Sequence, residues 1–232
     1  MSLLTVVQGA CERLGVSRPS IAHSSTDQQI IQIVGLAQQE GKELARRHDW
    51  QSIVKEKTFT TVAAETQTGA VPSDFDRIVN DTFYNRTATR KVDGPLSAQQ
   101  WQFQKSVVAT TLIEVFRFRG DDILIAPTPA AGQTMAYEYV SKNWCQSQAS
   151  VEAESWAADT DTGILSEELM TLGIIWRWQR VKGLDYAESF RTYEAQVAQA
   201  ILRDGGKRSF NIGGSRYDRV RSPYIPEGNW NP

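Results

Sequence analysis

The 232-residue sequence is poor in the side chains that most often carry out chemistry, since it contains two cysteines and two histidines. Cys11 and Cys145 are too few and too far apart for a disulfide framework, so we expect buried free thiols. His23 and His48 stand alone, without cysteine or acidic residues at the spacing of metal ligands. We therefore expect no metal and no cofactor, and neither histidine is a persuasive catalytic base.

Long apolar runs are missing as well. No segment approaches the roughly 20 apolar residues of a membrane span, and no basic stretch followed by an apolar core opens the chain. The formal net charge is −2, which indicates no general affinity for nucleic acid or membrane. We expect a protein made and kept in the cytoplasm, without a membrane partner, in which the glycosylation patterns at Asn80 and Asn85 are unused.

The sequence also lacks the short motifs of common enzymes. It has no Gly-rich phosphate loop, dinucleotide fingerprint, Gly-x-Ser-x-Gly elbow or paired zinc ligands. The acidic run at residues 159–163 begins like a calcium loop, but its glycine comes one position early and Met170 replaces the bidentate glutamate. We interpret its acids as caps of the next helix and predict a structural protein, not an enzyme. The alternative is an intracellular hydrolase with an unrecognised acidic site at Asp159 and Asp161.

Apolar residues at helical spacing dominate residues 156–204. Two helical patterns meet at Gly183, a residue type that commonly ends a helix, and Asp185 with Glu188 is typical of the next N-terminal cap. The stripes consist of Leu165, Leu169, Leu172 and Trp176, then Tyr186, Phe190, Tyr193, Val197 and Ile201. Their steps of 3 and 4 predict a helical hairpin. Neither helix can bury its stripe alone, so we expect the pair to pack on N-terminal helices.

The same hairpin is apolar over more than one stripe, which a pair of helices rarely hides. We therefore expect part of it to contact a neighbouring copy of the chain. Aromatic side chains are common anchors of protein interfaces, and Trp178 and Tyr193 are our candidates for this subunit interface.

Two further helices are predicted at the N-terminus. The first carries apolar residues at helical steps before a glycine, namely Leu4, Val7, Cys11, Leu14 and then Gly15. The second opens with a capping box at residues 25–28 and runs to about Trp50. Gly35 and Gly41 each destabilise it by about 1 kcal/mol relative to alanine, unless close packing offsets that loss.

Residues 57–148 are richer in threonine, valine and aromatic residues and are typical of β-structure. The expected strands are residues 57–63, 77–84, 88–92, 113–119, 122–126 and 134–140. A capping box at Ser97 and Gln100 predicts a short helix over 97–105. Arg119-Gly-Asp121 lies between two apolar runs, which favours the tip of a hairpin over an adhesion signal.

The expected fold class is α+β, a helical bundle with an inserted β-rich region and an extended C-terminal arm. We divide the chain into N-terminal helices at 1–56, the β-rich insertion at 57–148, the helical hairpin at 149–204 and the arm at 205–232. Residues 149–204 carry ten acids and five bases, a net charge of −5, whereas the arm carries five bases and two acids, a net charge of +3. The body is acidic and the arm is basic.

The arm has too little apolar content to fold alone, because glycines and prolines interrupt it. It nevertheless keeps arginines and aromatic residues suited to anchoring on a partner. The candidate anchors are Arg216, Tyr217, Arg219, Arg221, Tyr224 and Trp230. The alternative is that the basic arm makes the protein a nucleic-acid-binding module, with a steep salt dependence.

Several phrases resemble the head-to-tail adaptor, or connector, proteins of tailed bacteriophages, particularly short-tailed ones. They are Ser2-Leu-Leu-Thr-Val-Val-Gln8, Ser25-Thr-Asp-Gln-Gln29, Asp74-Phe-Asp-Arg-Ile78, Asn85-Arg-Thr87, Gly94-Pro-Leu-Ser97 and the stretch from Trp156 to Trp178. The resemblance covers most of residues 1–204.

The resemblance implies a virion protein at the head-to-tail junction. Such proteins form a homo-oligomeric ring, commonly a dodecamer, under the portal protein, extend the DNA channel used in genome ejection and receive the tail or its nozzle. The helical body would form the ring wall, the β-rich part would face the tail, and the arm would dock on the portal. An acidic body suits double-stranded DNA that passes without specific binding, because like charges repel.

Overall fold

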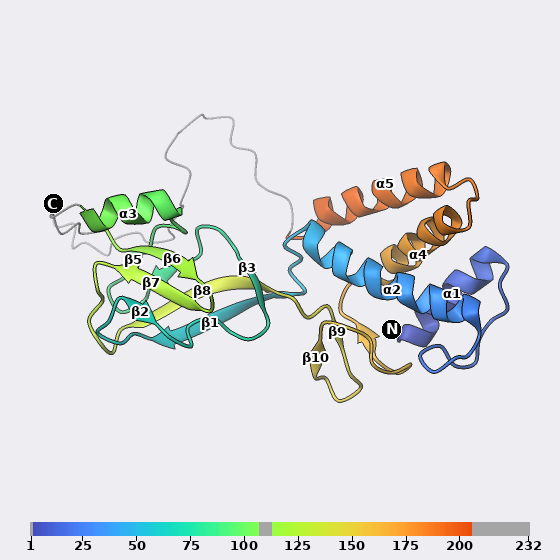
Figure 1. The fold of residues 1–232 in the computed structure, drawn as a ribbon, viewed down its shortest axis with the longest axis horizontal. Helices are drawn as coiled ribbons and strands as arrows, with labels where there is room; N and C mark the ends of the chain where they lie inside the picture. The colour runs from blue at the N-terminus through green and yellow to red at the C-terminus, as the bar shows by residue number, and fades with distance from the viewer. Residues whose placement is uncertain (1, 107–112, 206–232) are drawn as a thin grey trace, which may run out of the picture.

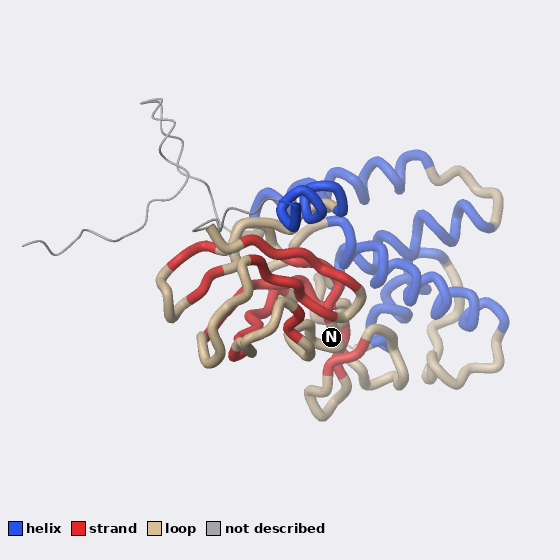
Figure 2. The backbone as a smooth tube through the Cα atoms, turned by 60° about the vertical axis from the view of Figure 1, so that its left-hand side comes forward, coloured by secondary structure: helices blue, strands red, loops and turns tan. Residues whose placement is uncertain are grey.

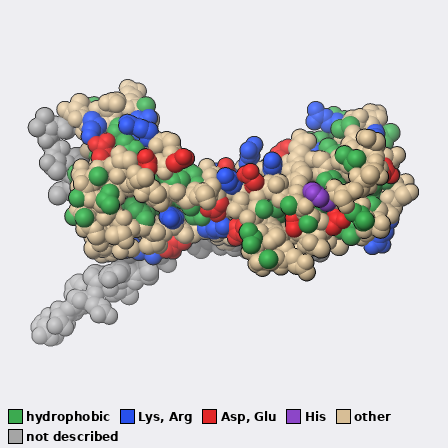
Figure 3. Space-filling model, turned by 60° about the horizontal axis from the view of Figure 1, so that its bottom comes forward, with side chains coloured by type: hydrophobic (Ala, Val, Ile, Leu, Met, Phe, Trp, Pro, Cys, Tyr) green, Lys and Arg blue, Asp and Glu red, His purple; other side chains and the backbone are tan. Residues whose placement is uncertain are grey.

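The structure is a computed structural model and describes residues 2–106 and 113–205. Two lobes are joined by a narrow waist, which is visible in the ribbon and in the space-filling view (Figures 1 and 3). Figure 2 shows that most of the helical segments lie in one lobe and most of the strands in the other. The chain is therefore a mixed α+β protein, as its sequence predicts.

Four helices form the helical lobe. They are α1 (Leu3–Leu14), α2 (Gln28–Arg47), α4 (Glu167–Val181) and α5 (Ala187–Arg203). Helix α4 packs against each of the other three, and α1 also packs against α2. Nine of the fifteen residues of α4 are buried, which is typical of a helix surrounded by neighbours. The predicted hairpin α4–α5 thus packs on helices from the other end of the chain.

Local capping explains where these helices begin and end. The Ser2 side chain accepts from the backbone N–H of Thr5 at the start of α1, and Gly15 ends that helix with a left-handed φ of 68°. Helix α2 begins at Gln28, because Asp27 caps it by accepting from the N–H of Gln29 at 2.8 Å. The capping box predicted at 25–28 is therefore wrong, and α2 ends at Arg47, before Trp50.

Two sheets form most of the β lobe. One has the order β1 (Val54–Thr60), β8 (Thr134–Ser141), β4 (Tyr84–Asn85) and β5 (Arg90–Lys91), with β3 (Phe75–Ile78) also on β8. The other has the order β2 (Thr66–Gln67), β7 (Asp122–Ala126) and β6 (Val115–Arg119). Helix α3 (Ala98–Ser106) lies beside them, capped reciprocally by Ser97 and Gln100 as predicted. A third small sheet of β10 (Glu152–Ala153), β9 (Cys145–Gln146) and β11 (Thr162–Gly163) lies under the helical lobe (Figure 1).

The hairpin predicted at Arg119-Gly-Asp121 is confirmed. Arg119 pairs with Asp122 across the antiparallel strands β6 and β7, and Gly120 adopts a φ of 59° in the turn between them. The strand predicted over 77–84 is wrong in its middle, because the chain turns at Asp81, whose φ is 65°. The two ends of that segment become β3 and β4, which pair with successive parts of β8.

Each lobe has a hydrophobic core of its own. The helical core joins residues from both ends of the chain and contains Trp50, Trp144, Trp156, Trp176 and Trp178. The β core is built mainly from phenylalanine and tyrosine around Phe83 and Tyr137. Tryptophan therefore marks one core and the smaller aromatic residues mark the other.

Candidate functional site

The two aspartates of the possible acidic site are held by backbone groups. The Asp159 carboxylate accepts from the N–H groups of Ala22 and His23, at 3.1 and 2.6 Å. The Asp161 carboxylate accepts from the N–H groups of Ala157 and Ala158, at 2.7 and 2.8 Å. Both carboxylates thus fix loops, which is the role of structural residues. No observation supports a paired acid and base.

The expected role of these aspartates as caps of the next helix is wrong. Helix α4 begins four residues beyond Gly163, with Ser166 at its N-cap position. Instead, the backbone carbonyl groups of Asp159 and Asp161 accept from the N–H groups of Leu4 and Leu3, at 3.2 and 2.8 Å. This segment holds the start of α1, a contact that local spacing cannot reveal.

The described residues contain no group of three or more histidine, cysteine or acidic side chains placed to hold a metal ion. Cys11 and Cys145 are buried free thiols, as expected. Burial raises the pKa of Cys145 to about 12, which makes its thiolate scarce at neutral pH. None of the helices in the described ranges combines the length and apolar character that a membrane span requires.

A buried charged cluster ties three helices of the helical lobe together. Glu40 on α2 has no exposed surface and accepts from the Tyr193 hydroxyl on α5 at 2.6 Å. Arg177 on α4 donates from Nε to Glu40 at 2.8 Å. The Nη2 of Arg177 also forms ion pairs, with Glu40 at 2.6 Å and with Glu43 at 3.0 Å. Burial raises the pKa of Glu40, and the bonds from Tyr193 and Arg177 oppose this rise.

Sequence reasoning missed this cluster, although one signal was present. Glu40 follows Ile33 and Ala37 at helical steps on a face that is otherwise apolar, and a charge there needs a buried partner. The partner is 137 residues away along the chain. Gly173 makes room for it, because a β-carbon at that position would lie 2.1 Å from the Glu40 carboxyl carbon.

The two candidate interface residues lie inside the subunit. Tyr193 has no exposed surface, and Trp178 is 9% exposed. A direct contact between Tyr193 and a neighbouring copy would therefore require its side chain to leave Glu40. The subunit interface itself stays a prediction. The six predicted portal-binding residues, Arg216, Tyr217, Arg219, Arg221, Tyr224 and Trp230, lie outside the described residues.

Exposed apolar side chains gather where α4 turns into α5. They are Val181, Leu184, Tyr186 and Phe190, whose exposed fractions run from 36% to 55%. We call this set the turn patch. The Phe190 and Tyr186 rings contact Trp176 from outside, with ring centroids 5.1 and 6.5 Å away. The turn patch is thus an outward extension of the aromatic core.

The waist is fixed by charged side chains from both lobes. Arg77 on β3 donates to Asp49 at 2.8 Å and to the carbonyl oxygen of His48 at 2.9 Å, where it satisfies backbone groups just beyond α2. Lys55 on β1 forms ion pairs with Asp74, which precedes β3, and with Glu152 on β10 across the waist. Positive and negative side chains accordingly mix at the waist in Figure 3. These contacts orient one lobe relative to the other.

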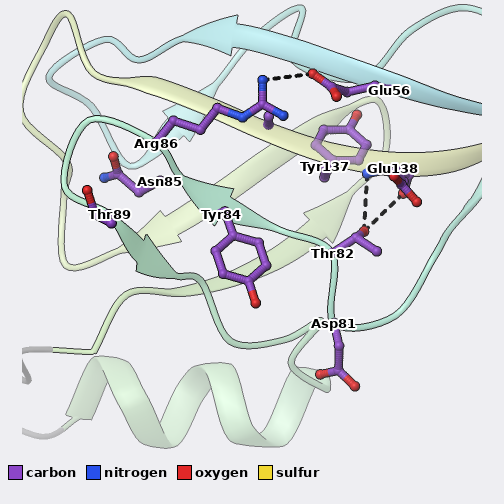
Figure 4. A pocket seen from close by; sticks show the side chains of 10 residues that line it. Glu56, Asp81, Thr82, Tyr84, Asn85, Arg86, Thr89, Tyr137 and Glu138 are labelled. Carbon is purple, nitrogen blue, oxygen red and sulfur yellow. Dashed lines mark hydrogen bonds and ion pairs between the residues drawn. The ribbon is translucent and has the colours of Figure 1, made fainter. Parts of the chain in front are cut away.

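The exposed face of the larger sheet carries an open groove of about 700 Å³ (Figure 4). Most of the residues that line it have a polar group in the side chain; the lining comprises Glu56, Asp81, Thr82, Tyr84, Asn85, Arg86, Thr89, Ala136, Tyr137 and Glu138. Arg86 pairs with Glu56 at 2.9 Å, and the Thr82 hydroxyl accepts from the backbone N–H of Glu138 at 3.1 Å. The groove has the character of a contact surface, without buried nucleophiles or bases.

The chain was compared with models of known protein families. A family model described as SU10 adaptor protein matches residues 1–223, which is nearly the whole chain. No curated protein matches the sequence. The match covers both lobes and most of the C-terminal segment.

Proposed function

Since the chain belongs to the SU10 adaptor protein family, we propose that it is a structural protein of a bacteriophage virion that joins the head to the tail. Several copies, in the expected case a dodecamer, bind the portal as a ring, extend the DNA channel and receive the tail or its nozzle. The family match over residues 1–223 is the observation that carries this proposal. In this role the protein needs neither a catalytic residue nor a cofactor, and DNA passes it without specific binding.

The two lobes suit two kinds of contact. The helical lobe forms the ring wall, and the β lobe, with its open polar groove, faces the tail components. The C-terminal arm, residues 205–232, docks on the portal through its arginines and aromatic residues. Ion pairs at the waist keep the two contact surfaces in a fixed relation.

The turn patch supplies the contact between neighbouring copies. Its four side chains are apolar and exposed in the single chain, and aromatic residues are frequent anchors of interfaces. Tyr193 then supports the interface from beneath, because its ring contacts Trp176 under the patch, with a centroid distance of 6.1 Å. Trp178 belongs to the same core. In a ring, such a contact is head-to-tail and repeats around the axis.

The test is the mass of the full chain in solution, measured alone and with purified portal rings. We expect a ring of copies on the portal. Leu184→Asp combined with Phe190→Asp should weaken this assembly by at least about tenfold, since charge then replaces apolar contact area. Leu202→Asp is the matched control, because Leu202 is 77% exposed on α5 yet lies outside the turn patch.

Absence of any complex with portal rings would overturn the proposed function. Tight binding to double-stranded DNA that weakens steeply with salt would instead favour the nucleic-acid-binding alternative. Equal loss of assembly in the patch variant and in the Leu202→Asp control would reject the turn patch as the subunit contact.

A further inference from the structure

Strand β1 has an open edge. It is the end strand of its sheet, and pairs antiparallel with β8 along all seven of its residues. Among residues 2–106 and 113–205, no strand pairs with its other side. An unpaired edge offers a row of backbone donors and acceptors to another strand.

The pairing register identifies the free backbone groups. Just outside β1, the N–H of Ser141 donates to the carbonyl oxygen of Ile53 at 2.9 Å, and the N–H of Thr61 donates to that of Gln133 at 2.8 Å. Residues bonded to β8 alternate with residues that direct their backbone groups away from it. By this alternation the outward residues are Glu56, Thr58 and Thr60, and no backbone partner of theirs is found in the described chain.

The exposed face along this edge carries an excess of negative charge. Glu56 lies directly opposite Glu138 on β8, and both side chains are exposed. Like charges opposite each other destabilise a strand pair. Arg86 neutralises Glu56, whereas Glu138 forms no ion pair with any residue in the described ranges. A strand with basic side chains on this face would relieve the repulsion.

The chain's own C-terminal segment starts beside this edge. At the end of α5, the Asp204 carboxylate accepts from the backbone N–H of Gln51 at 3.0 Å, three residues before β1 begins. The thirteen residues from Gly205 to Tyr217 can span up to about 40 Å. Strand β1 is only about 20 Å long. The segment can therefore reach every position on the edge.

The sequence of residues 217–221 complements both faces of β1. If these residues are extended, Tyr217, Arg219 and Arg221 share one face, and Asp218 lies on the other. Arginines would then lie beside Glu56 and on the same face as Glu138, which is one strand further in on β8. Asp218 would lie on the face of Lys57.

We propose that residues 217–221 of the same chain add as a strand to the free edge of β1 before the protein meets its partner. This contact is a resting position of the arm to which the proposed function assigns portal binding. The strand edge and the portal then compete for the same arginines. The inference itself does not depend on the portal, because it concerns the free protein.

Hydrogen exchange of single amides in the full chain tests the proposal. The N–H groups of Glu56, Thr58 and Thr60 should exchange roughly tenfold more slowly in the native chain than in Arg219→Pro, since proline cannot form the strand pairing. Ser209→Pro is the matched control, because it lies in the arm outside residues 217–221. The amides of Lys57 and Phe59, bonded to β8, should be unaffected by either change.

Three outcomes decide the matter. Protection that is lost only in Arg219→Pro and is independent of protein concentration supports the proposal. Equal exchange in the native chain and in Arg219→Pro overturns it. Protection that increases with concentration also overturns it, in favour of a strand from a second copy. Loss of protection on adding portal rings would support competition, and a portal that fails to bind would count against the proposed function alone.

Discussion

The two lobes fill their interiors in different ways. The β lobe is closed by aromatic rings in mutual contact, such as Phe83 with Phe116 at a centroid distance of 4.7 Å. The helical lobe places a charged cluster among its tryptophans, with Glu40 fully buried and Arg177 at 5% exposure. Apolar packing tolerates changes that conserve volume, whereas a buried charge requires each of its partners. The β lobe buries a carboxylate too, that of Glu114, but its cation is 3.5 Å away and half exposed. The helical lobe should therefore lose more stability when one partner of its buried cluster is removed.

Removing Arg177 should have the largest effect. Arg177→Ala leaves the Glu40 carboxylate buried without its cation, and breaking a buried pair in this way costs about 4 kcal/mol. Tryptophan emission in a denaturant titration would report the loss, because five tryptophans belong to the helical core. Arg180→Ala, an exposed change on the same helix, should stay within about 0.5 kcal/mol. A similar small effect for Arg177→Ala would contradict the view that the charged cluster holds this lobe.

Substitution of two glycines on α2 should give the next largest change in the stability of the helical lobe. A β-carbon at Gly41 would lie 2.4 Å from the Trp144 ring, so Gly41→Ala should destabilise the helical lobe by about 2 kcal/mol. Gly35 has no atom within 4 Å of that position, so Gly35→Ala should stabilise the lobe by about 0.7 kcal/mol. Thermal unfolding of the two variants would show opposite shifts. Shifts of the same sign would mean that Trp144 moves aside without strain.

The same two glycines show how far sequence reasoning reaches. Their helix was predictable from its apolar period, and so was the need for close packing to offset a glycine. Which glycine is packed was not predictable, because Trp144 lies about a hundred positions further along the chain. The hairpin at Gly120 and the cap at Ser97 were predicted correctly, because the residues that form each of them lie within a few positions of one another.

The candidate surfaces follow the same rule. The apolar period identified the hairpin α4–α5, but it could not separate residues that face the core from those left outside. Trp178 and Tyr193 were chosen as interface residues and lie inside, while Leu184 and Phe190 lie outside. Burial of a hairpin residue depends on which other helix covers its side of the hairpin. Helix α2, which covers α4, comes from the far end of the chain.

The waist offers a way to separate the lobes. Arg77→Ala removes the contacts of β3 with the segment after α2, which should cost about 1.5 kcal/mol and weaken the coupling between the two cores. We expect tryptophan emission and the exchange of β8 amides to report different unfolding midpoints in this variant. Arg119→Ala, an exposed change at the end of β6 within the β lobe, is the control that should leave the two midpoints together. Coincident midpoints in Arg77→Ala would show that other waist contacts suffice.

Acid should affect the helical lobe and the waist in opposite directions. Burial raises the pKa of Glu40 above its ordinary 4.5, so the folded state binds a proton more readily than the unfolded state. Its contribution to stability is fully present below pH 4.5 and is lost as the pH rises through the folded value. At Asp74, burial would raise the pKa, but hydrogen bonds from Lys55, Ser141 and Tyr139 lower it below 3.8.

The Asp74 contribution is therefore present above pH 3.8 and is lost as the pH falls through its folded value. The effect of Asp74 on stability should be the smallest of the predicted effects, because Asp74 and Lys55 are partly exposed to solvent. Denaturant titrations between pH 3 and 7 would separate the contributions of Glu40 and Asp74 to stability. Glu40→Gln should remove the gain in stability on acidification towards pH 4.5, and Asp74→Asn should flatten the loss below about pH 4. If Glu40→Gln leaves the profile unchanged, the carboxylate is already fully compensated by Arg177, and the two lobes respond to acid alike.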